Sequence, residues 1–215
     1  MTRVKICGLT NLADARCAWQ AGADLLGFVL VPSSRRYVPP GAVAEITTAL
    51  LAEGCAARLV GVWLNAPAEL VRETTLYCGL HLAQLHGDES PQYVAGLGAP
   101  ALVARRMRPE LSWAHLAAYP AWGYLLDTDH PTSPGGTGQV WDWGSLPRDE
   151  TPEAGARPPR WLIAGGLTAE NVAACVRRAH PWGVDVSSGV EHAPGRKDPA
   201  RIARFIHQVR EVDRQ

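Results

Sequence analysis

Two reactive side chains, a thiol and a carboxyl group, each end a short apolar run of the sequence. Cys7 closes residues 4–7, and Asp127 closes residues 124–127. A cysteine thiolate can remove a proton, and a partly buried carboxyl group can donate one. Each also has an ordinary structural interpretation, because cysteine often packs as a small apolar residue and aspartate often caps a turn. As a pair they predict an acid and a base that act on one ligand.

Three glycine-rich segments follow later apolar runs, at residues 135–138, 165–167 and 187–190. Backbone N–H groups that no side chain covers bind phosphate well, above all near the start of a helix. One such segment alone is typical of an ordinary turn, but segments after two consecutive late runs predict a phosphate site. The residues assigned to that site are Gly165, Gly166, Ser188 and Gly189, and Gly136 and Gly138 are expected near its opening.

Arg36, in the sequence SSRRY at residues 33–37, is the candidate for binding a planar carboxylate through two hydrogen bonds. A solvated surface charge explains an arginine there equally well. His86 and Asp185 belong to other apolar runs or their ends and are expected to line the same opening, without an assigned catalytic role. The five cysteines are scattered, with no C-x-x-C pair and no histidines at metal-ligand spacing, so neither a metal site nor a disulfide is predicted.

Short apolar runs alternate with longer stretches of helical periodicity, which is typical of strand–helix units around a parallel sheet. The predicted strands are residues 4–7, 25–30, 59–64, 82–85, 102–106, 124–127, 161–164 and 184–186. The predicted helices are residues 11–21, 40–53, 67–78, 90–97, 110–118, 169–179 and 199–210. Eight units favour an α/β fold, a single-domain (β/α)8 TIM barrel of eight parallel strands over residues 1–215, rather than an open doubly wound sheet. Such a barrel places its chemistry at the carboxyl ends of the strands, where Cys7 and Asp127 stand.

The charge composition is balanced, with 21 Lys and Arg residues against 21 Asp and Glu residues. No net field therefore attracts nucleic acid or an anionic membrane, and a bound anion needs a local site. No apolar run approaches the roughly 20 residues of a membrane span, and the first residues lack the layout of a signal peptide, so we expect a cytoplasmic protein. Residues 130–139 and 147–159 break the regular spacing and are interpreted as loops, the second without an assigned role.

The ordered motifs resemble the phosphoribosylanthranilate isomerase family over nearly the whole chain. They include KICGLT at 5–10, SRRY at 34–37, QLHGD at 84–88, LLD at 125–127, GGTG at 135–138, AGGL at 164–167 and VDVSSGVE at 184–191. The resemblance implies the rearrangement of a phosphorylated aminosugar, N-(5-phosphoribosyl)anthranilate, to a ribulose-type amine in tryptophan biosynthesis, with no cofactor. It also implies Cys7 as the base at the sugar C2, Asp127 as the acid at the ring oxygen and Arg36 as the partner of the anthranilate carboxylate.

Two alternatives differ in chemistry from this isomerase. A related phosphosugar barrel, indole-glycerol-phosphate synthase, needs a catalytic lysine, and the sequence offers only Lys5 and Lys197, the latter expected in a loop. A non-catalytic phosphate-binding barrel needs no acid–base pair, so Cys7 with Asp127 argues against it. The sequence leaves open whether the chain is a monomer or a homodimer, and whether histidine-pathway aminosugars are also accepted.

Overall fold

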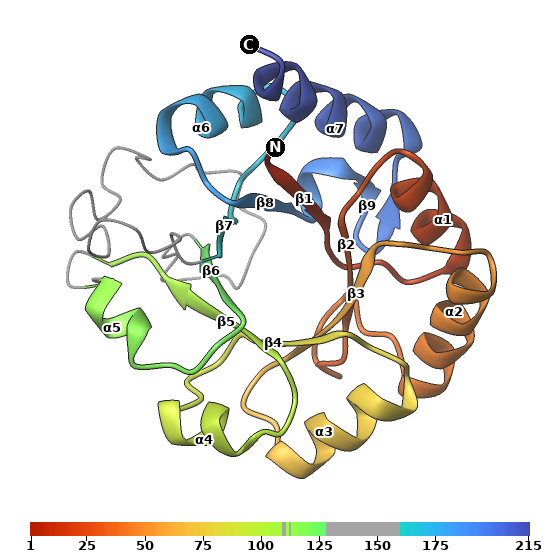
Figure 1. Ribbon diagram of the computed structural model, residues 1–215. Coiled ribbons are helices and arrows are strands. Elements are labelled where there is room, and N and C mark those ends of the chain that lie inside the picture. Colours follow the sequence, from red (N-terminus) through yellow and green to blue (C-terminus); the bar gives the residue numbers. More distant parts are fainter. Residues whose placement is uncertain (109–110, 112, 128–159) are drawn as a thin grey trace.

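Eight parallel strands close into a barrel in which each strand pairs with the next along the chain and β8 pairs with β1 (Figure 1). The computed structural model describes residues 1–108, 111, 113–127 and 160–215. The strands are β1 (Arg3–Ile6), β2 (Leu25–Val29), β3 (Arg58–Trp63), β4 (Leu82–Leu85), β5 (Ala101–Arg106), β6 (Gly123–Asp127), β7 (Trp161–Ile163) and β8 (Gly183–Val186). This confirms the predicted barrel, and the strand ends differ from the prediction by no more than one residue.

Helices surround the barrel and cover its outer face (Figure 1). They are α1 (Leu12–Gln20), α2 (Pro40–Ala52), α3 (Ala68–Tyr77), α4 (Pro91–Gly96), α5 (Trp113–Ala117), α6 (Val172–Ala179) and α7 (Pro199–Asp213). After β8 come a 3-10 turn, η2 (Ser188–Val190), and two short antiparallel strands, β9 (Glu191–Ala193) and β10 (Arg196–Lys197). The predicted loops at 130–139 and 147–159 lie outside the described residues.

The start of α6 differs from the prediction for a local reason. The N-cap of α1 is Asn11, whose side chain accepts a hydrogen bond from the N–H of Asp14. The predicted helix at residues 169–179 is too long at its start, since α6 begins only after Asn171. The Asn171 side chain accepts from the N–H of Thr168 at 2.8 Å and donates to the carbonyl of Gly166 at 2.9 Å. These bonds hold the segment as a turn, in competition with the helix.

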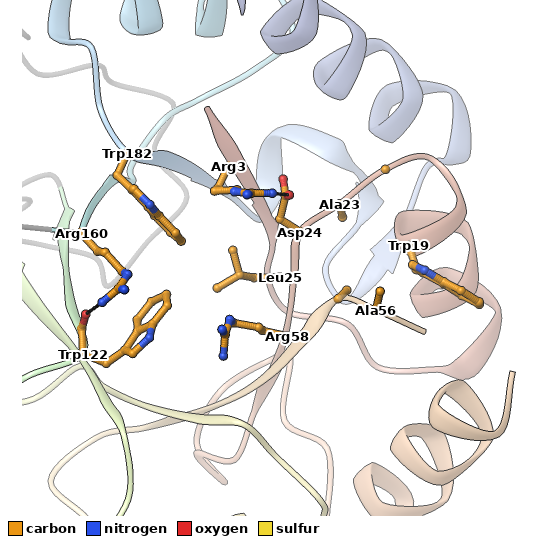
Figure 2. Close-up of a pocket in the computed structure, with 12 residues that line it drawn as sticks. Arg3, Trp19, Ala23, Asp24, Leu25, Ala56, Arg58, Trp122, Arg160 and Trp182 are labelled. Carbon is orange, nitrogen blue, oxygen red and sulfur yellow. Dashed lines mark hydrogen bonds and ion pairs between the residues drawn. The ribbon is translucent and has the colours of Figure 1, made fainter. Parts of the chain in front are cut away.

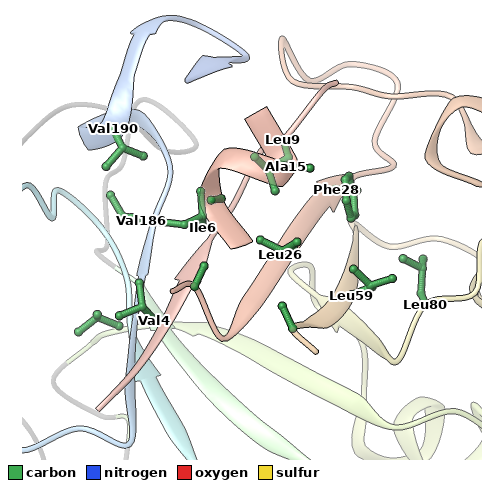
Figure 3. Packing of buried hydrophobic residues seen from close by; sticks show 14 of the residues in the cluster. Val4, Ile6, Leu9, Ala15, Leu26, Phe28, Leu59, Leu80, Val186 and Val190 are labelled. Atoms are coloured by element: carbon green, nitrogen blue, oxygen red, sulfur yellow. The ribbon is translucent and has the colours of Figure 1, made fainter. Parts of the chain in front are cut away.

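Residues of each strand alternate between the helices and the barrel interior. Val4 and Ile6 of β1 pack with Leu26 and Phe28 of β2 in the layer beneath the helices (Figure 3). Lys5, which lies between Val4 and Ile6, is fully buried and points the other way, into the barrel. The alternation thus carries a charged residue into the interior at a position flanked by apolar side chains.

The barrel closes through contacts between the two ends of the chain. β1 and β8 pair over four residues, from Arg3 opposite Gly183 to Ile6 opposite Val186. Just before β1, the N–H of Thr2 donates to the carboxylate of Asp213 at the end of α7. The last helix therefore fastens the first strand in place. Within the described ranges, no helix has the length and apolar character needed to cross a bilayer.

Candidate active site

Cys7 directly follows β1, at the carboxyl end of the barrel. Its backbone N–H donates to the carbonyl of Val186 at 2.9 Å, and the residue is only 7% exposed. Gly8 has a positive φ of 74°, and a Cβ there would lie 2.5 Å from Cδ of Arg36 and 2.8 Å from Oγ of Ser187. Glycine at this position therefore lets the chain turn and lets the Arg36 side chain pass close to Cys7.

A buried ion pair lies in the barrel interior on the side of Cys7 toward the amino end. Nζ of Lys5 is 2.7 Å from Oδ1 of Asp185, and the two residues are register partners on β1 and β8. On β2, a Cβ at Gly27 would lie 2.9 Å from Sγ of Cys7 and 3.0 Å from Nζ of Lys5. The missing side chain of Gly27 thus makes room for both groups. Asp185, which was expected to line the opening, is instead buried below it.

The surroundings of the Cys7 thiol act on its charge in opposite directions. Burial raises the pKa of Cys7 above its usual value, and the cations of Lys5 and Lys197 offset only part of that rise. Burial also disfavours the ammonium form of Lys5, but Asp185 and Cys7 outweigh burial and raise the pKa of Lys5 above its usual value. Lys5 therefore stays protonated at neutral pH and supplies a positive charge beside the sulfur atom.

Arg36, from the segment between β2 and α2, forms a bidentate ion pair with Glu191 of β9. Nε lies 2.8 Å from Oε1, and Nη2 lies 2.7 Å from Oε2. Glu191 also accepts a hydrogen bond from Nζ of Lys197 at 2.8 Å. Burial opposes the charge on Glu191, but Arg36 and Lys197 hold the pKa of its carboxyl group below the usual value. Arg36 is therefore a paired, largely buried cation and not a solvated charge. The expectation that Lys197 lies in a loop is also wrong, because Lys197 belongs to β10 and its side chain is fully buried.

The pair with Glu191 determines which edge of Arg36 can meet a ligand. A guanidinium group presents two edges that suit a carboxylate, and Glu191 occupies the edge formed by Nε and Nη2. The other edge consists of Nη1 and the second N–H of Nη2. In the part of the chain that the structure describes, Nη1 forms no hydrogen bond. Arg36 can thus bind a second planar carboxylate while it remains paired with Glu191.

Asp127 ends β6 and lies close to His86, which follows β4. Nε2 of His86 is 3.2 Å from Oδ2 of Asp127, and Nδ1 of His86 is 2.9 Å from Nε2 of Gln84. Gln84 is almost completely buried, so its amide is held in place beneath the imidazole. When Gln84 donates to Nδ1, the neutral imidazole carries its proton on Nε2, where it points at Asp127. The carboxyl group at the end of β6 thus has a hydrogen-bond donor beside it.

The predicted phosphate-binding residues lie in two loops at the same end of the barrel, after β7 and after β8. Gly165 and Gly166 have positive φ angles of 89° and 63°. A Cβ at Gly189 would collide with the carbonyl oxygen of Leu167, so the two loops pack directly against each other. Among the described residues, no hydrogen bond engages the backbone N–H groups of Gly165, Gly166, Ser188 or Gly189. These groups can therefore donate to an anion.

Two predicted residues of the site cannot be located, and two residues of the site were not predicted. Gly136 and Gly138, expected near the opening, lie outside the described residues. Sequence reasoning did not assign Glu191 or Lys197 to the site. Glu191 stands 155 positions from its partner Arg36, and local spacing holds no signal for a contact of that kind.

The opposite, amino end of the barrel contains a hollow of about 450 Å³ (Figure 2). Its wall includes residues that precede or begin strands, among them Arg3, Leu25, Arg58, Trp122, Arg160 and Trp182. The rings of Trp122 and Trp182 meet edge to face at 5.4 Å, and the guanidinium groups of Arg58 and Arg160 lie 5.4 and 5.1 Å from the Trp122 ring. Contacts at the amino end of a barrel serve stability, so we interpret the two tryptophans as residues that close this end of the barrel and stabilise it.

Comparisons with known proteins point to one family. A family model described as N-(5'phosphoribosyl)anthranilate (PRA) isomerase matches residues 4–208. The N-(5'-phosphoribosyl)anthranilate isomerase of Pelobacter propionicus is 43% identical over 212 residues, which cover 99% of this chain and 97% of that protein.

Solved structures show the same similarity. The phosphoribosyl anthranilate isomerase of Thermotoga maritima has a TM-score of 0.85 at 32% identity, covering 98% of this chain and all of that one. Monomers generated from that enzyme, which is described as dimeric, give a TM-score of 0.81 with the same identity and coverage. A phosphoribosyl anthranilate isomerase in complex with reduced 1-(o-carboxyphenylamino)-1-deoxyribulose 5-phosphate gives 0.82, again at 32% identity and the same coverage.

Proposed function

This chain belongs to the N-(5'-phosphoribosyl)anthranilate isomerase family, and we propose that Cys7 and Asp127 are the base and the acid of its reaction. The enzyme converts N-(5-phosphoribosyl)anthranilate to 1-(2-carboxyphenylamino)-1-deoxyribulose 5-phosphate in tryptophan biosynthesis. One observation carries the assignment of the two residues. The thiol follows β1 and the carboxyl group ends β6, so both stand at the carboxyl end of one closed parallel barrel.

The proposed reaction moves protons only. Asp127 donates a proton to the ring oxygen, the bond from C1 to that oxygen breaks, and the anthranilate nitrogen supplies the electron pair that forms the iminium. The iminium acidifies the proton on C2, and the Cys7 thiolate removes it. The electrons of that C–H bond form the C1–C2 double bond of an enolamine, which tautomerises to the ketone. Substrate and product are isomers, so the balance needs no oxidant or reductant.

Substrate binding is assigned to the two ends of the mouth. The edge of Arg36 that Glu191 leaves available suits the anthranilate carboxylate. The backbone N–H groups of Gly165, Gly166, Ser188 and Gly189 suit the 5-phosphate, because they come from two loops in direct contact. These two anion sites hold opposite ends of one molecule and leave its sugar between the acid and the base.

The lysines of the chain do not favour a second candidate function. A synthase of the phosphosugar class needs a lysine amino group open to its substrate. Lys5 and Lys197 are fully buried, and each is paired with a carboxylate. No observation therefore favours that chemistry.

Loss of substrate fluorescence in purified protein tests the acid–base assignment. We expect Cys7→Ala and Asp127→Asn each to reduce kcat by about 10² or more while a product analogue still binds. Cys17→Ala is the matched control, because Cys17 lies on α1 outside the site, and it should keep wild-type activity. Near-wild-type turnover by either site variant would refute its assigned role, and a folded but inert wild type would contradict the isomerase activity itself.

A homodimer is proposed for the protein in solution, supported by the description of the Thermotoga maritima relative as dimeric. Sedimentation velocity at several protein concentrations tests it. A single species with twice the mass of the chain is expected, and a monomer at all concentrations would exclude the dimer.

A cytoplasmic location is also proposed. All five cysteines are free thiols, which suits a reducing compartment. Fractionation of cells that express the chain should recover it with cytoplasmic markers, and recovery in an oxidising compartment would contradict the proposal.

A further inference from the structure

The ion pair of Lys5 and Asp185 lies beside the proposed base but has no part in the reaction steps above. We propose that Lys5 is a positioning residue whose ammonium group favours the thiolate form of Cys7, and that Asp185 in turn holds Lys5 in place. The inference rests on the proposed function, in which Cys7 removes the C2 proton. It assigns to the barrel interior a role in setting the charge of the base.

The geometry brings the ammonium group and the sulfur atom together. Lys5 lies in β1 and Cys7 follows its last residue, two positions further on, so both side chains point to the same side, toward Gly27. The position of a Cβ on Gly27 would be 2.9 Å from Sγ and 3.0 Å from Nζ, which places both atoms around one small space. The charge of Lys5 acts there to lower the pKa of Cys7. A cation this close to sulfur favours the anionic form.

The balance of charges around Cys7 also favours its thiolate form. Five charged side chains either face Cys7 or form an ion pair with a side chain that faces it. The cations are Lys5, Arg36 and Lys197, and the carboxylates are Asp185 and Glu191. Three cations against two carboxylates leave one positive charge. An unbalanced charge is costly to bury, and a Cys7 thiolate completes the balance.

Lys5 and Asp185 act on the thiol in opposite directions, which gives the proposal a sharp test. Burial raises the pKa of Cys7, Lys5 lowers it, Asp185 raises it, and Lys197 lowers it. Replacing either member of the Lys5–Asp185 pair breaks the same salt bridge. If the pair were merely structural, both replacements would affect the enzyme in the same way. If Lys5 sets the charge of Cys7, the two replacements must shift its titration oppositely.

The experiment compares Lys5→Met and Asp185→Asn with the wild-type enzyme. The Cys7 titration is read directly as the ultraviolet absorbance of the thiolate, taken as the difference between each protein and its Cys7→Ser counterpart across pH. The pH profile of kcat/KM is measured in parallel. We expect Lys5→Met to move the titration and the acid limb of the profile to higher pH, with at least about a tenfold loss of activity at neutral pH that recovers as pH rises. Asp185→Asn should move both to lower pH.

Shifts in the same direction for both variants, or no shift in either folded protein, would overturn the proposal. Circular dichroism checks that each variant folds. If Lys5→Met does not fold, Lys197→Met is the second variant that removes a cation, and it should move the Cys7 titration to higher pH. Failure of the proposed function has a different signature. If Cys7 were not the base, the absorbance titration would still shift with Lys5 while the activity profile would not follow it.

Discussion

Nε2 of His86 lies 3.2 Å from Oδ2 of Asp127, which places an imidazole N–H beside the carboxyl group that is assigned as the acid. When Asp127 gives up its proton to the ring oxygen, a carboxylate forms at this position, and the adjacent donor stabilises it. The buried Gln84 holds the imidazole from its other side. We therefore expect His86→Phe, which keeps a ring of similar size but no donor, to lower kcat by about tenfold with little change in KM. An unchanged kcat would show that His86 only lines the mouth.

Glu191 should affect substrate binding through Arg36. Glu191→Gln removes the charge that orients the guanidinium, so we expect KM to rise by about tenfold. Arg36→Lys should raise KM further, because an ammonium group cannot form the planar fork. Steady-state kinetics measure both effects. The exposed pair of Arg16 and Glu53 is also bidentate, and Arg16→Ala serves as the control that should leave KM unchanged.

Gly189→Ala should weaken phosphate binding. Its Cβ would collide with the carbonyl oxygen of Leu167, so the two loops must move apart. The expected result is a rise in KM and in the inhibition constant for inorganic phosphate, each by about tenfold, which is what about 1.4 kcal/mol of lost binding would give. Gly41→Ala, on α2, is the control, because a Cβ there meets nothing within 4 Å. Equal inhibition constants in both variants would remove this loop from the phosphate site.

Asp24 should make stability depend on pH in the acid range. Its carboxylate accepts hydrogen bonds from Arg3 at 2.6 Å, Arg210 at 2.8 Å and the N–H of Val4 at 2.9 Å, and these contacts outweigh burial and lower its pKa. A lowered folded-state pKa gives stability that is present above the unfolded pKa and is lost as pH falls through the folded one. Asp24→Asn should therefore lower the free energy of unfolding by about 1–3 kcal/mol at pH 7, and the gap to wild type should close in acid. Urea unfolding of wild type and variant at pH 7 and at an acid pH measures the difference in the free energy of unfolding. Glu69→Gln is the control, because the Glu69 side chain is exposed.

Local patterns in the sequence were enough to predict the barrel and the positions of Cys7 and Asp127. Strands are short and alternate with helices, so apolar runs located them to within one residue. The late start of α6 escaped prediction because it depends on side-chain bonds from Asn171 that compete with the helix. Glycine-rich segments at strand ends are equally local signals, and they predict Gly165 and Gly189 as phosphate-binding residues.

The ion pairs of the site could not be predicted in the same way. The sequence left Arg36 open between a carboxylate-binding residue and a surface charge, and its pairing with Glu191 depends on the chain after β8. Lys197 looked like a loop residue, although the short β9–β10 hairpin buries it. Each pairing depends on how distant strands meet when the barrel closes, and neither composition nor spacing records that.

The pairing of β1 with β8 also has a consequence for the newly made chain. Lys5 leaves the ribosome near the beginning of synthesis, while Asp185 follows 180 positions later. Bringing them together requires a long loop-closure step, so this contact belongs among the slow, non-local events of folding. A nascent or truncated chain that lacks β8 and the residues after it carries Cys7 and Lys5 without Asp185, Glu191 or Lys197. The buried surroundings of the thiol, in which Asp185 holds Lys5 in place, are therefore complete only when the last strand has docked.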